Sequence, residues 1–275
     1  MQTVKKGMVI SMRYGLIGEK LGHSYSKIIH AKLADYMYDL IPLTREEFKS
    51  FMEARDFAAI NVTIPYKQDV IPYLDEIDER ALKIGAVNTI VNKDGKLKGY
   101  NTDIYGFIYM LKQHDIQVTG KKCLILGDGG TSHTVQAALS FLNASEIYVV
   151  SRKASLNELK QNPASLVNTI SYDDCYQFHT DADVIVNTTS AGMYPNIDLS
   201  PLDLTTFTSC KAVADVIYNP IKTKLTLQAE QLGMKAVNGL EMLVAQAVQA
   251  AEYFLDTKYD EKIIDEIYKE ILETL

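Results

Sequence analysis

Cysteine and positive charge are scarce in this 275-residue chain, and long apolar runs are absent. The three cysteines, Cys123, Cys175 and Cys210, lie far apart and lack the paired spacing of a zinc site or a disulfide framework. We therefore expect buried or idle thiols in a reducing cytoplasm. Lys and Arg number 28 against 35 Asp and Glu, which gives a net charge of −7. Because a protein that tracks phosphates needs a basic face, general binding to nucleic acid or to acidic membranes is excluded.

No apolar run approaches the roughly 20 residues that a membrane span requires. The apolar part of residues 1–10 is also too short for a secretory signal. Met12 stands directly before the apolar segment that starts at Tyr14, so residues 1–11 are expected to be an extension outside the fold. With 47% apolar residues the chain can build real cores, and its length suits one large or two modest domains.

Short apolar strands alternate with helical segments, which favours an α/β protein with parallel sheets built from βαβ units. The first unit is predicted to contain strands at 14–17 and 60–64 and helices at 27–38 and 69–84. A second, Rossmann-like unit is predicted from a helix at 134–142 and strands at 122–126, 147–150, 184–187 and 212–216. Residues 240–275 are predicted to be mostly helical.

A glycine-rich loop follows the strand at 122–126 and leads into a helix. It reads Gly127-Asp128-Gly129-Gly130-Thr131. Glycines at such a junction let the backbone approach a pyrophosphate, whose charge is met by the amides of the helix N-terminus. The loop therefore predicts a dinucleotide site, and the alternative is an ordinary glycine turn.

The segment Ser151-Arg152-Lys153 follows the next strand and indicates which dinucleotide binds. An acidic residue here would accept hydrogen bonds from the ribose 2′-hydroxyl of NAD, whereas cations suit the 2′-phosphate of NADP. We therefore predict NADP.

A second polar constellation follows the strand at 60–64. Lys67 comes just after Pro65, Asn88 precedes another short apolar strand, and Asp103 opens a helical segment. Each has an ordinary alternative role, for Lys67 a solvated side chain and for Asp103 a helix N-cap. Oxidation of a secondary alcohol needs one acid/base group at the reacting oxygen, and Lys67 is the candidate.

These motifs occur in the order found in shikimate dehydrogenases, and the chain resembles that family from Gly15 to Gln246. The matching segments are 23–26, 61–67, 85–89, 101–103, 187–193, 215–220 and 239–243. The resemblance implies the reversible, NADPH-dependent reduction of 3-dehydroshikimate to shikimate in aromatic amino acid biosynthesis.

The resemblance also implies roles for particular residues. Lys67 and Asp103 would be the catalytic pair at the reacting hydroxyl. The substrate carboxylate would be held by Ser24, Ser26 and Tyr218, and its hydroxyls by Thr63, Asn88 and Gln246. The cofactor would be bound by Gly127, Gly129, Gly130, Thr131, Ser151, Arg152, Lys153, Asn187, Thr188, Met193 and Gly239. Ser24 and Ser26 could instead cap a helix, Gln246 could lie on an exposed helix face, and Met193 could be a core residue.

The implied architecture has two domains with the active site in the cleft between them. Residues 12–106 and 240–275 would bind substrate, and 107–239 would bind NADP. The chain is compatible with a monomer or a homodimer. His23 and His30 lack the company of a metal site, so no metal is expected.

Two departures from the family pattern stand out. Asp128 replaces a small neutral residue, and its carboxylate is expected to point to solvent, away from the pyrophosphate. Lys27 and Ala31 stand where the family has Pro and Asn, so the helix entrance near the substrate is altered.

Three other functions stay open at this point. A quinate/shikimate dehydrogenase shares the Lys and Asp pair, and Arg152 counts against its NAD-dependent form. Methylenetetrahydrofolate dehydrogenase lacks the paired Ser24 and Ser26. A catalytically silent NADP-binding sensor would not need Lys67 and Asp103.

Overall fold

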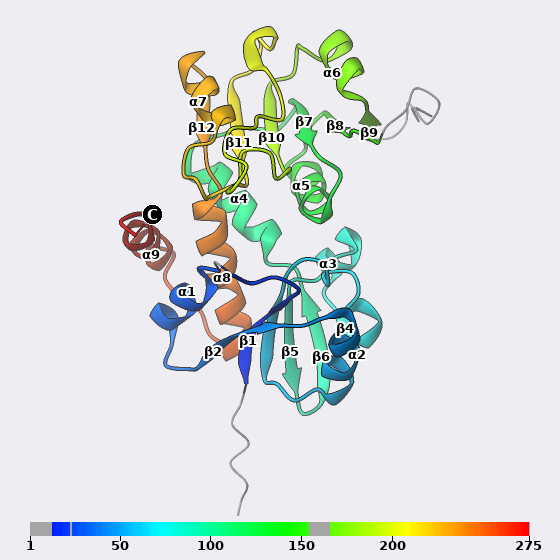
Figure 1. Cartoon of the computed structure of the whole chain (residues 1–275), viewed down its shortest axis with the longest axis vertical. Coiled ribbons are helices and arrows are strands. Elements are labelled where there is room, and N and C mark those ends of the chain that lie inside the picture. Colours follow the sequence, from blue (N-terminus) through cyan, green and yellow to red (C-terminus); the bar gives the residue numbers. More distant parts are fainter. Residues whose placement is uncertain (1–12, 23, 154–165, 275) are drawn as a thin grey trace, which may run out of the picture.

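The computed structural model describes residues 13–22, 24–153 and 166–274. The predicted extension at 1–11 and the side chain of His23 lie outside the described residues. Two sheets lie one above the other along the longest axis of the molecule (Figure 1). The predicted two-part α/β architecture is confirmed.

The first sheet has six strands in the order β2-β1-β3-β5-β6-β4. Their bounds are β1 Tyr14–Gly18, β2 Tyr38–Pro42, β3 Ala59–Val62, β4 Glu76–Ile77, β5 Thr89–Lys93 and β6 Lys96–Tyr100. The sheet is mixed, since β5 runs antiparallel to both β3 and β6. The prediction of parallel strands throughout was wrong here. An Asp94-Gly95 turn with positive φ at both residues, a hairpin signal, joins β5 to β6.

The second sheet is parallel throughout, with the order β12-β11-β10-β7-β8-β9. Its strands are β7 Lys122–Leu126, β8 Glu146–Val150, β9 Val167–Ile170, β10 Val184–Asn187, β11 Ala212–Asp215 and β12 Lys235–Val237. In this order the strand sequence reverses between β7 and β10, the switch point at which Rossmann-like sheets bind ligands. The Rossmann-like prediction is confirmed.

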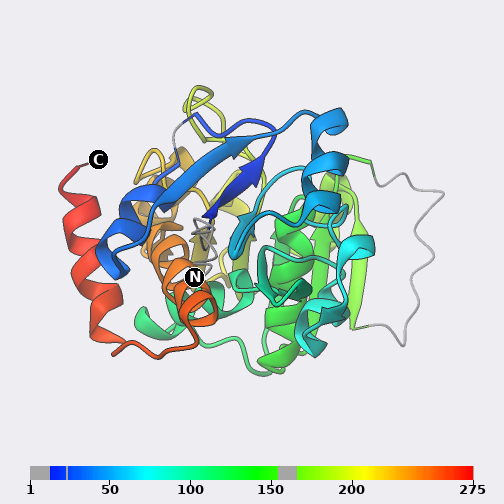
Figure 2. The ribbon, with the colours of Figure 1, turned by 90° about the horizontal axis from the view of Figure 1, so that it is seen from below.

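Helices cover both sheets and join them. Their bounds are α1 Ser26–Leu33, α2 Arg45–Ala54, α3 Glu79–Ile84, α4 Asp103–Gln113, α5 Gly130–Phe141, α6 Tyr172–Phe178, α7 Lys224–Gln231, α8 Leu240–Leu255 and α9 Lys262–Leu272, with short 3₁₀ turns at Ile71–Tyr73 and Leu204–Thr206. Figure 2 shows α1 and α9 close to α8, and the three share one buried apolar cluster.

Three predicted helices were wrong in extent. The helix expected at 134–142 is α5, which begins four residues earlier, at Gly130. The helix expected at 27–38 ends at Leu33, and the chain turns to form β2, which pairs in parallel with β1. The helix expected at 69–84 exists only as α3. Before α3 the chain forms the 3₁₀ turn Ile71–Tyr73 and then the short strand β4. Pro72 lies in this turn, and because it lacks an N–H it cannot donate the hydrogen bond of a continuing helix. Asp78 caps α3 by accepting a hydrogen bond from the backbone of Arg80 at 3.0 Å.

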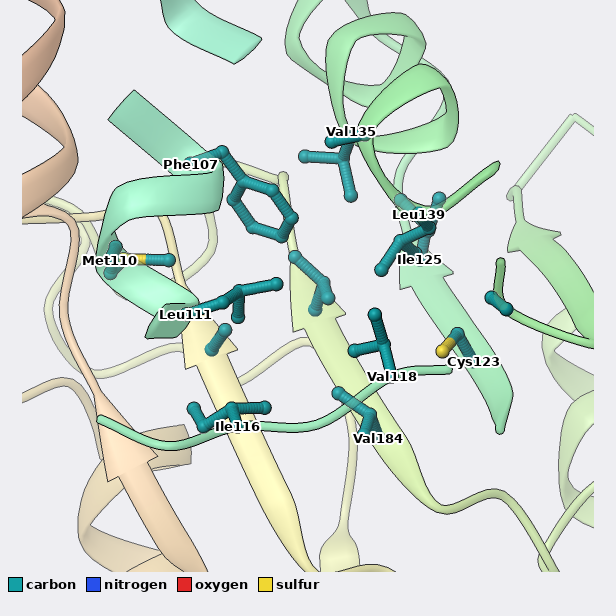
Figure 3. Close-up of a cluster of buried hydrophobic side chains, with 14 of the residues drawn as sticks. Phe107, Met110, Leu111, Ile116, Val118, Cys123, Ile125, Val135, Leu139 and Val184 are labelled. Atoms are coloured by element: carbon teal, nitrogen blue, oxygen red, sulfur yellow. The ribbon is translucent and has the colours of Figure 1, made fainter. Parts of the chain in front are cut away.

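Helix α4 links the two halves. Its side chains Phe107, Met110 and Leu111 pack into a core with Ile125 of β7 and Val135 of α5 (Figure 3). The same helix packs along α8, which also contacts β5 of the first sheet. The division into 12–106 with 240–275, and 107–239, stays a prediction. Its first boundary falls inside α4.

Candidate active site

Lys67 and Asp103 form a short ion pair. The distance between Lys67 Nζ and Asp103 Oδ2 is 2.6 Å, and the side chains are 17% and 11% exposed. Neither is therefore a freely solvated surface group, which excludes the ordinary alternative for Lys67. The pair combines a proton donor with a carboxylate that fixes its direction.

The backbone around Lys67 is held by its neighbours. Lys67 lies in the turn that follows β3, beyond the last strand residue, Val62. Its carbonyl accepts a hydrogen bond from the backbone of Val87 at 2.8 Å. The preceding Tyr66 is buried, stacks on Phe48 at 4.3 Å and donates its hydroxyl to the Leu43 carbonyl at 2.6 Å. This anchor limits where the Lys67 side chain can reach.

Asp103 is the first residue of α4 and not its N-cap. Asn101 takes part of that role, since its Oδ1 accepts from the backbone of Ile104 at 3.3 Å. The carboxylate of Asp103 is thereby left to face Lys67. The positive end of the helix dipole favours negative charge at this position.

The ion pair lies in the wall of a cavity of about 530 Å³ between the two sheets. All eight residues predicted to bind substrate line it, together with four predicted for the cofactor: Ser24, Ser26, Thr63, Lys67, Asn88, Asp103, Tyr218 and Gln246, with Thr131, Thr188, Met193 and Gly239. Met193 is 45% exposed, so it is not a core residue. The predicted residues that the cavity brings together are up to 222 positions apart in the sequence, counted from Ser24 to Gln246.

Ser24, Ser26 and Tyr218 bring hydroxyl groups to this cavity. Ser26 is the first residue of α1, and the helix has no side-chain cap. Ser24 Oγ accepts from the backbone of Ser26 at a long 3.3 Å. The ring of Tyr218 meets Tyr25 edge-on at 6.0 Å, and burial raises the pKa of Tyr218, with a further contribution from Tyr25. Its phenol therefore keeps its proton and can donate a hydrogen bond.

Asn88 lies at the centre of a buried amide and hydroxyl network. Its Oδ1 accepts from the backbone of Thr102 at 2.7 Å, and its Nδ2 donates to Thr102 Oγ1 at 3.0 Å. Gln246 Oε1 accepts from Thr102 Oγ1 at 3.3 Å, so Gln246 does not lie on an exposed helix face. Asn61 joins the network through Thr89 at 3.1 Å and also lines the cavity. Asn61 is the first residue of the segment 61–67, and no role was predicted for it.

A second cavity of about 460 Å³ lies at the switch point, where β7 and β10 lie side by side. It contains Gly127, Gly129, Ser151, Arg152, Lys153 and Thr188 from the predicted cofactor set. Thr188, Thr189 and Ser190 line both cavities, which therefore share a wall. Thr189 and Ser190 were missed, although they directly follow the predicted Asn187-Thr188.

The glycine loop leaves room for a ligand. Gly127 has φ +98°, and a Cβ there would press on Thr189. At Gly129 and Gly130, in contrast, an added Cβ would meet no atom within 4 Å. The open space beside these two residues fits a backbone that a pyrophosphate approaches.

Three predicted residues take a different part from the expected one. Asn187 is fully buried and donates to Asp215 Oδ1 at 3.0 Å, so it supports the cavity wall from behind. A Cβ at Gly239 would overlap the carbonyl of Val216, so the protein's own backbone requires this glycine. Asp128 does not simply point to solvent, because its Oδ2 accepts from Ser151 Oγ at 2.8 Å.

Asp215 was missed as a supporting residue. It is fully buried at the end of β11, and its partners besides Asn187 are the backbone of Ile217 at 3.0 Å and Thr223 Oγ1 at 2.8 Å. Burial raises the pKa of its carboxyl to about 6. Asn187 Oδ1 in turn accepts from Thr189 Oγ1 at 2.7 Å. Asp215 thus ties the shared wall to the loop that carries Tyr218.

His30 has a structural environment. Its ring stacks on Tyr38 at 4.0 Å, its Nδ1 lies 2.5 Å from the Tyr36 hydroxyl, and burial lowers its pKa to about 3. Within the described ranges no group of three His, Cys, Asp or Glu side chains could hold a metal ion. No helix in the described part of the chain is long and apolar enough to cross a membrane.

An ion pair in a cavity that adjoins a glycine-loop cavity at the switch point is typical of α/β oxidoreductases that use a dinucleotide. Residues 16–90 match the family described as shikimate dehydrogenase substrate binding domain. A shikimate dehydrogenase (NADP(+)) from Clostridium perfringens is 38% identical over 266 residues, which cover 94% of this chain and 97% of that protein. The chain belongs to the shikimate dehydrogenase family.

Solved structures agree with this assignment. A chorismate mutase/shikimate 5-dehydrogenase fusion protein from Clostridium acetobutylicum is 39% identical with a TM-score of 0.86, and the match covers 96% of this chain and 98% of that chain. Shikimate 5-dehydrogenase from Thermus thermophilus, solved in complex with NADP(H) and shikimate, is 26% identical with a TM-score of 0.81, covering 94% and 99%.

Proposed function

We propose that the chain catalyses the NADP-dependent interconversion of shikimate and 3-dehydroshikimate, with Lys67 and Asp103 as its acid/base pair. The observation that carries this proposal is the 2.6 Å contact between the two side chains in a cavity that adjoins the glycine-loop cavity. The family assignment supports the substrate class, and the geometry supports the roles proposed for Lys67 and Asp103.

Lys67 is the group that moves the proton. In the reducing direction its ammonium donates a proton to the carbonyl oxygen of 3-dehydroshikimate as the alcohol forms. In the reverse direction the neutral amine accepts the hydroxyl proton. Asp103 directs the amine and offers its second oxygen, Oδ1, to the substrate hydroxyl.

The carboxylate of the substrate fits the hydroxyl groups that Ser24, Ser26 and Tyr218 bring to the cavity. Ser24, Ser26 and the protonated phenol of Tyr218 are neutral donors. Helix α1 begins at Ser26, so its free backbone N–H groups and positive dipole end also lie there. These groups can hold an anion without placing another cation beside Lys67.

The remaining hydroxyls of the substrate face Thr63, Asn88 and Gln246. Because Asn88 and Gln246 are held by Thr102, their amide groups are fixed before substrate arrives. Such preorganisation lowers the entropy cost of binding. It also orients the reacting carbon toward the wall that carries Thr188 and Met193.

NADP fits the residues around both cavities. The open space at Gly129 and Gly130 suits its pyrophosphate, Arg152 and Lys153 suit its 2′-phosphate, and Thr131, Thr188 and Met193 line the passage to the reacting end. When bound, NADP supplies the hydride acceptor or donor. Asn187 and Gly239 shape the wall from behind.

The cellular location and the oligomeric state are also proposals. The three cysteines are free and buried, which supports a reducing compartment, and we infer a cytoplasmic location. A monomer or a homodimer is compatible with the site, because every residue assigned to it comes from one chain.

The test is the nicotinamide absorbance of purified protein mixed with NADP and shikimate, with quinate and NAD as crossed controls. We expect rapid reduction with NADP and shikimate. Reduction only with quinate would favour the quinate dehydrogenase alternative. If the protein bound NADP but reduced no cofactor with either shikimate or quinate, the result would favour the silent sensor and contradict the proposal.

A further inference from the structure

The carboxylate of Asp128 lies in the wall of the second cavity, among the groups assigned to the 2′-phosphate. Its Oδ2 accepts from Ser151 Oγ at 2.8 Å and lies 3.8 Å from Lys153 Nζ. Arg152 lines the same cavity. One negative and two positive side chains therefore share the place where the two dinucleotides differ.

The hydroxyl of Ser151 already makes two hydrogen bonds within the protein. Ser151 is buried, its single hydroxyl proton is donated to Asp128, and its oxygen accepts from the backbone of Lys153 at 3.1 Å. It has no proton left for a phosphate oxygen. An incoming 2′-phosphate would thus meet two exposed cations and one carboxylate, and the carboxylate already has Lys153 within ion-pair distance.

A ribose with a free 2′-hydroxyl meets a different environment. The hydroxyl is a hydrogen-bond donor, and a carboxylate beside the glycine loop is an acceptor for it. An acidic side chain fills this role in NAD-binding Rossmann sites, where it follows the second strand. Here the residue after the second strand of this sheet, β8, is Ser151, and the carboxylate comes from the glycine loop and is held in place by that serine.

We propose that Asp128 is a specificity-determining residue, which accepts the ribose 2′-hydroxyl of NAD and repels the 2′-phosphate of NADP, so that the chain binds both dinucleotides. The inference rests on the proposed function, since the second cavity must be the adenosine end of the cofactor site. Asp128 is 41% exposed, so its effect is screened. We expect a change of up to about fivefold in relative affinity, the size typical of a partly exposed charge interaction.

The experiment is calorimetric titration of the full chain, without shikimate, with adenosine 2′,5′-bisphosphate and with 5′-AMP. The test variant is Asp128→Asn, which removes the charge and keeps an oxygen that can accept from Ser151. The matched control is Asp181→Asn. Asp181 pairs with Lys122 at 2.6 Å, at the start of β7, whereas the glycine loop follows the end of the same strand.

Asp128→Asn is expected to lower the Kd of the bisphosphate up to about fivefold relative to that of 5′-AMP, and this gain should shrink in high salt. Asp181→Asn should leave the ratio unchanged. Equal shifts for both ligands, or no shift, would overturn the role of Asp128 while leaving the proposed function intact. If the parent protein bound neither nucleotide and oxidised no shikimate with NADP, the assignment of the cavity itself would fall, and this inference with it.

Discussion

The two sides of the substrate cavity hold their carboxylates in opposite ways. On the side of the first sheet, Asp103 faces the ammonium of Lys67 and keeps some contact with solvent. On the side of the second sheet, Asp215 is fully buried and receives only neutral donors, from Asn187, Ile217 and Thr223. Burial raises the pKa of Asp215 to about 6.

This difference indicates that the two carboxylates have different roles, Asp103 in the proposed chemistry and Asp215 in supporting the fold. A carboxylate at the cavity surface with a cationic partner can hold a proton donor in line with substrate. A carboxylate beneath the wall cannot reach substrate, and its energetic role is to satisfy buried N–H and O–H groups. Substitutions on the two sides should therefore change different quantities, turnover on one side and folding stability on the other.

The largest effect is expected for Lys67→Ala. Removal of a positioned acid/base group typically costs 10²–10⁴ in rate, so we expect kcat to fall roughly 10³-fold, with a much smaller change in shikimate affinity. Initial rates and equilibrium titration of shikimate measure the two separately. If the kcat of Lys67→Ala were within a few fold of the parent value, Lys67 would not be the acid/base group. The proposed difference in role between the two sides of the cavity would then be wrong.

Asp215→Ala tests the other side. The change leaves three buried donors without an acceptor, which should lower the free energy of unfolding by roughly 3 kcal/mol. Urea denaturation measures it. Asp215→Asn is the control, since its amide oxygen can serve Asn187 and Ile217 while its amide nitrogen donates to Thr223. An Ala variant as stable as the Asn variant would show that the wall does not depend on this acceptor.

The pH dependence of the free energy of unfolding, compared between the parent and Asp215→Asn, gives a second test of the role of Asp215. A folded pKa of about 6 lies above the ordinary value of 3.8, so the folded state binds the proton more tightly than the unfolded state. The stabilising contribution of this group is therefore complete below about pH 4 and is lost as the pH rises through 6. Relative to the parent, Asp215→Asn should gain up to roughly 3 kcal/mol between these limits. A constant difference between the two proteins across that range would contradict the assignment.

The smallest effect is expected for Tyr66→Phe, beneath Lys67. The substitution keeps the stacking on Phe48 and removes the hydrogen bond to the buried Leu43 carbonyl. We expect a loss of about 1 kcal/mol in stability and a modest decrease in kcat. Thermal denaturation and initial rates measure both, and an unchanged kcat would show that the Lys67 turn is held without this anchor.

The second sheet and its cofactor loop were the most predictable parts of the molecule. The strand at 184–187 has the predicted bounds, and the glycine loop follows β7 as expected. Both are local signals, an apolar run and a group of glycines. The edge strands β9 and β12 of the second sheet were missed, as were β2, β4 and β6 of the first sheet, because pairing with other strands decides their conformation.

The candidate site was predictable only in part for the same reason. The identities of Lys67, Asn88 and Asp103 stand out in the sequence, and the family resemblance supplied Gln246. No local pattern shows that Gln246 meets Thr102, or that Asp128 meets Ser151. Such contacts depend on how separate elements meet, and they determine whether a polar residue binds a ligand or supports a neighbour.

Helix α4 carries Asp103, the carboxylate proposed for catalysis, at its first residue, and further along it carries Phe107 and Met110, which pack into the core of the second sheet. The two halves are therefore not interchangeable modules. A chimaera that replaced the part of the chain with the second sheet by joining at residue 106 would cut α4 between Asp103 and the residues that pack into that sheet's core. To exchange this part of the chain and keep the proposed acid/base pair, the new junction has to lie outside Asp103–Gln113.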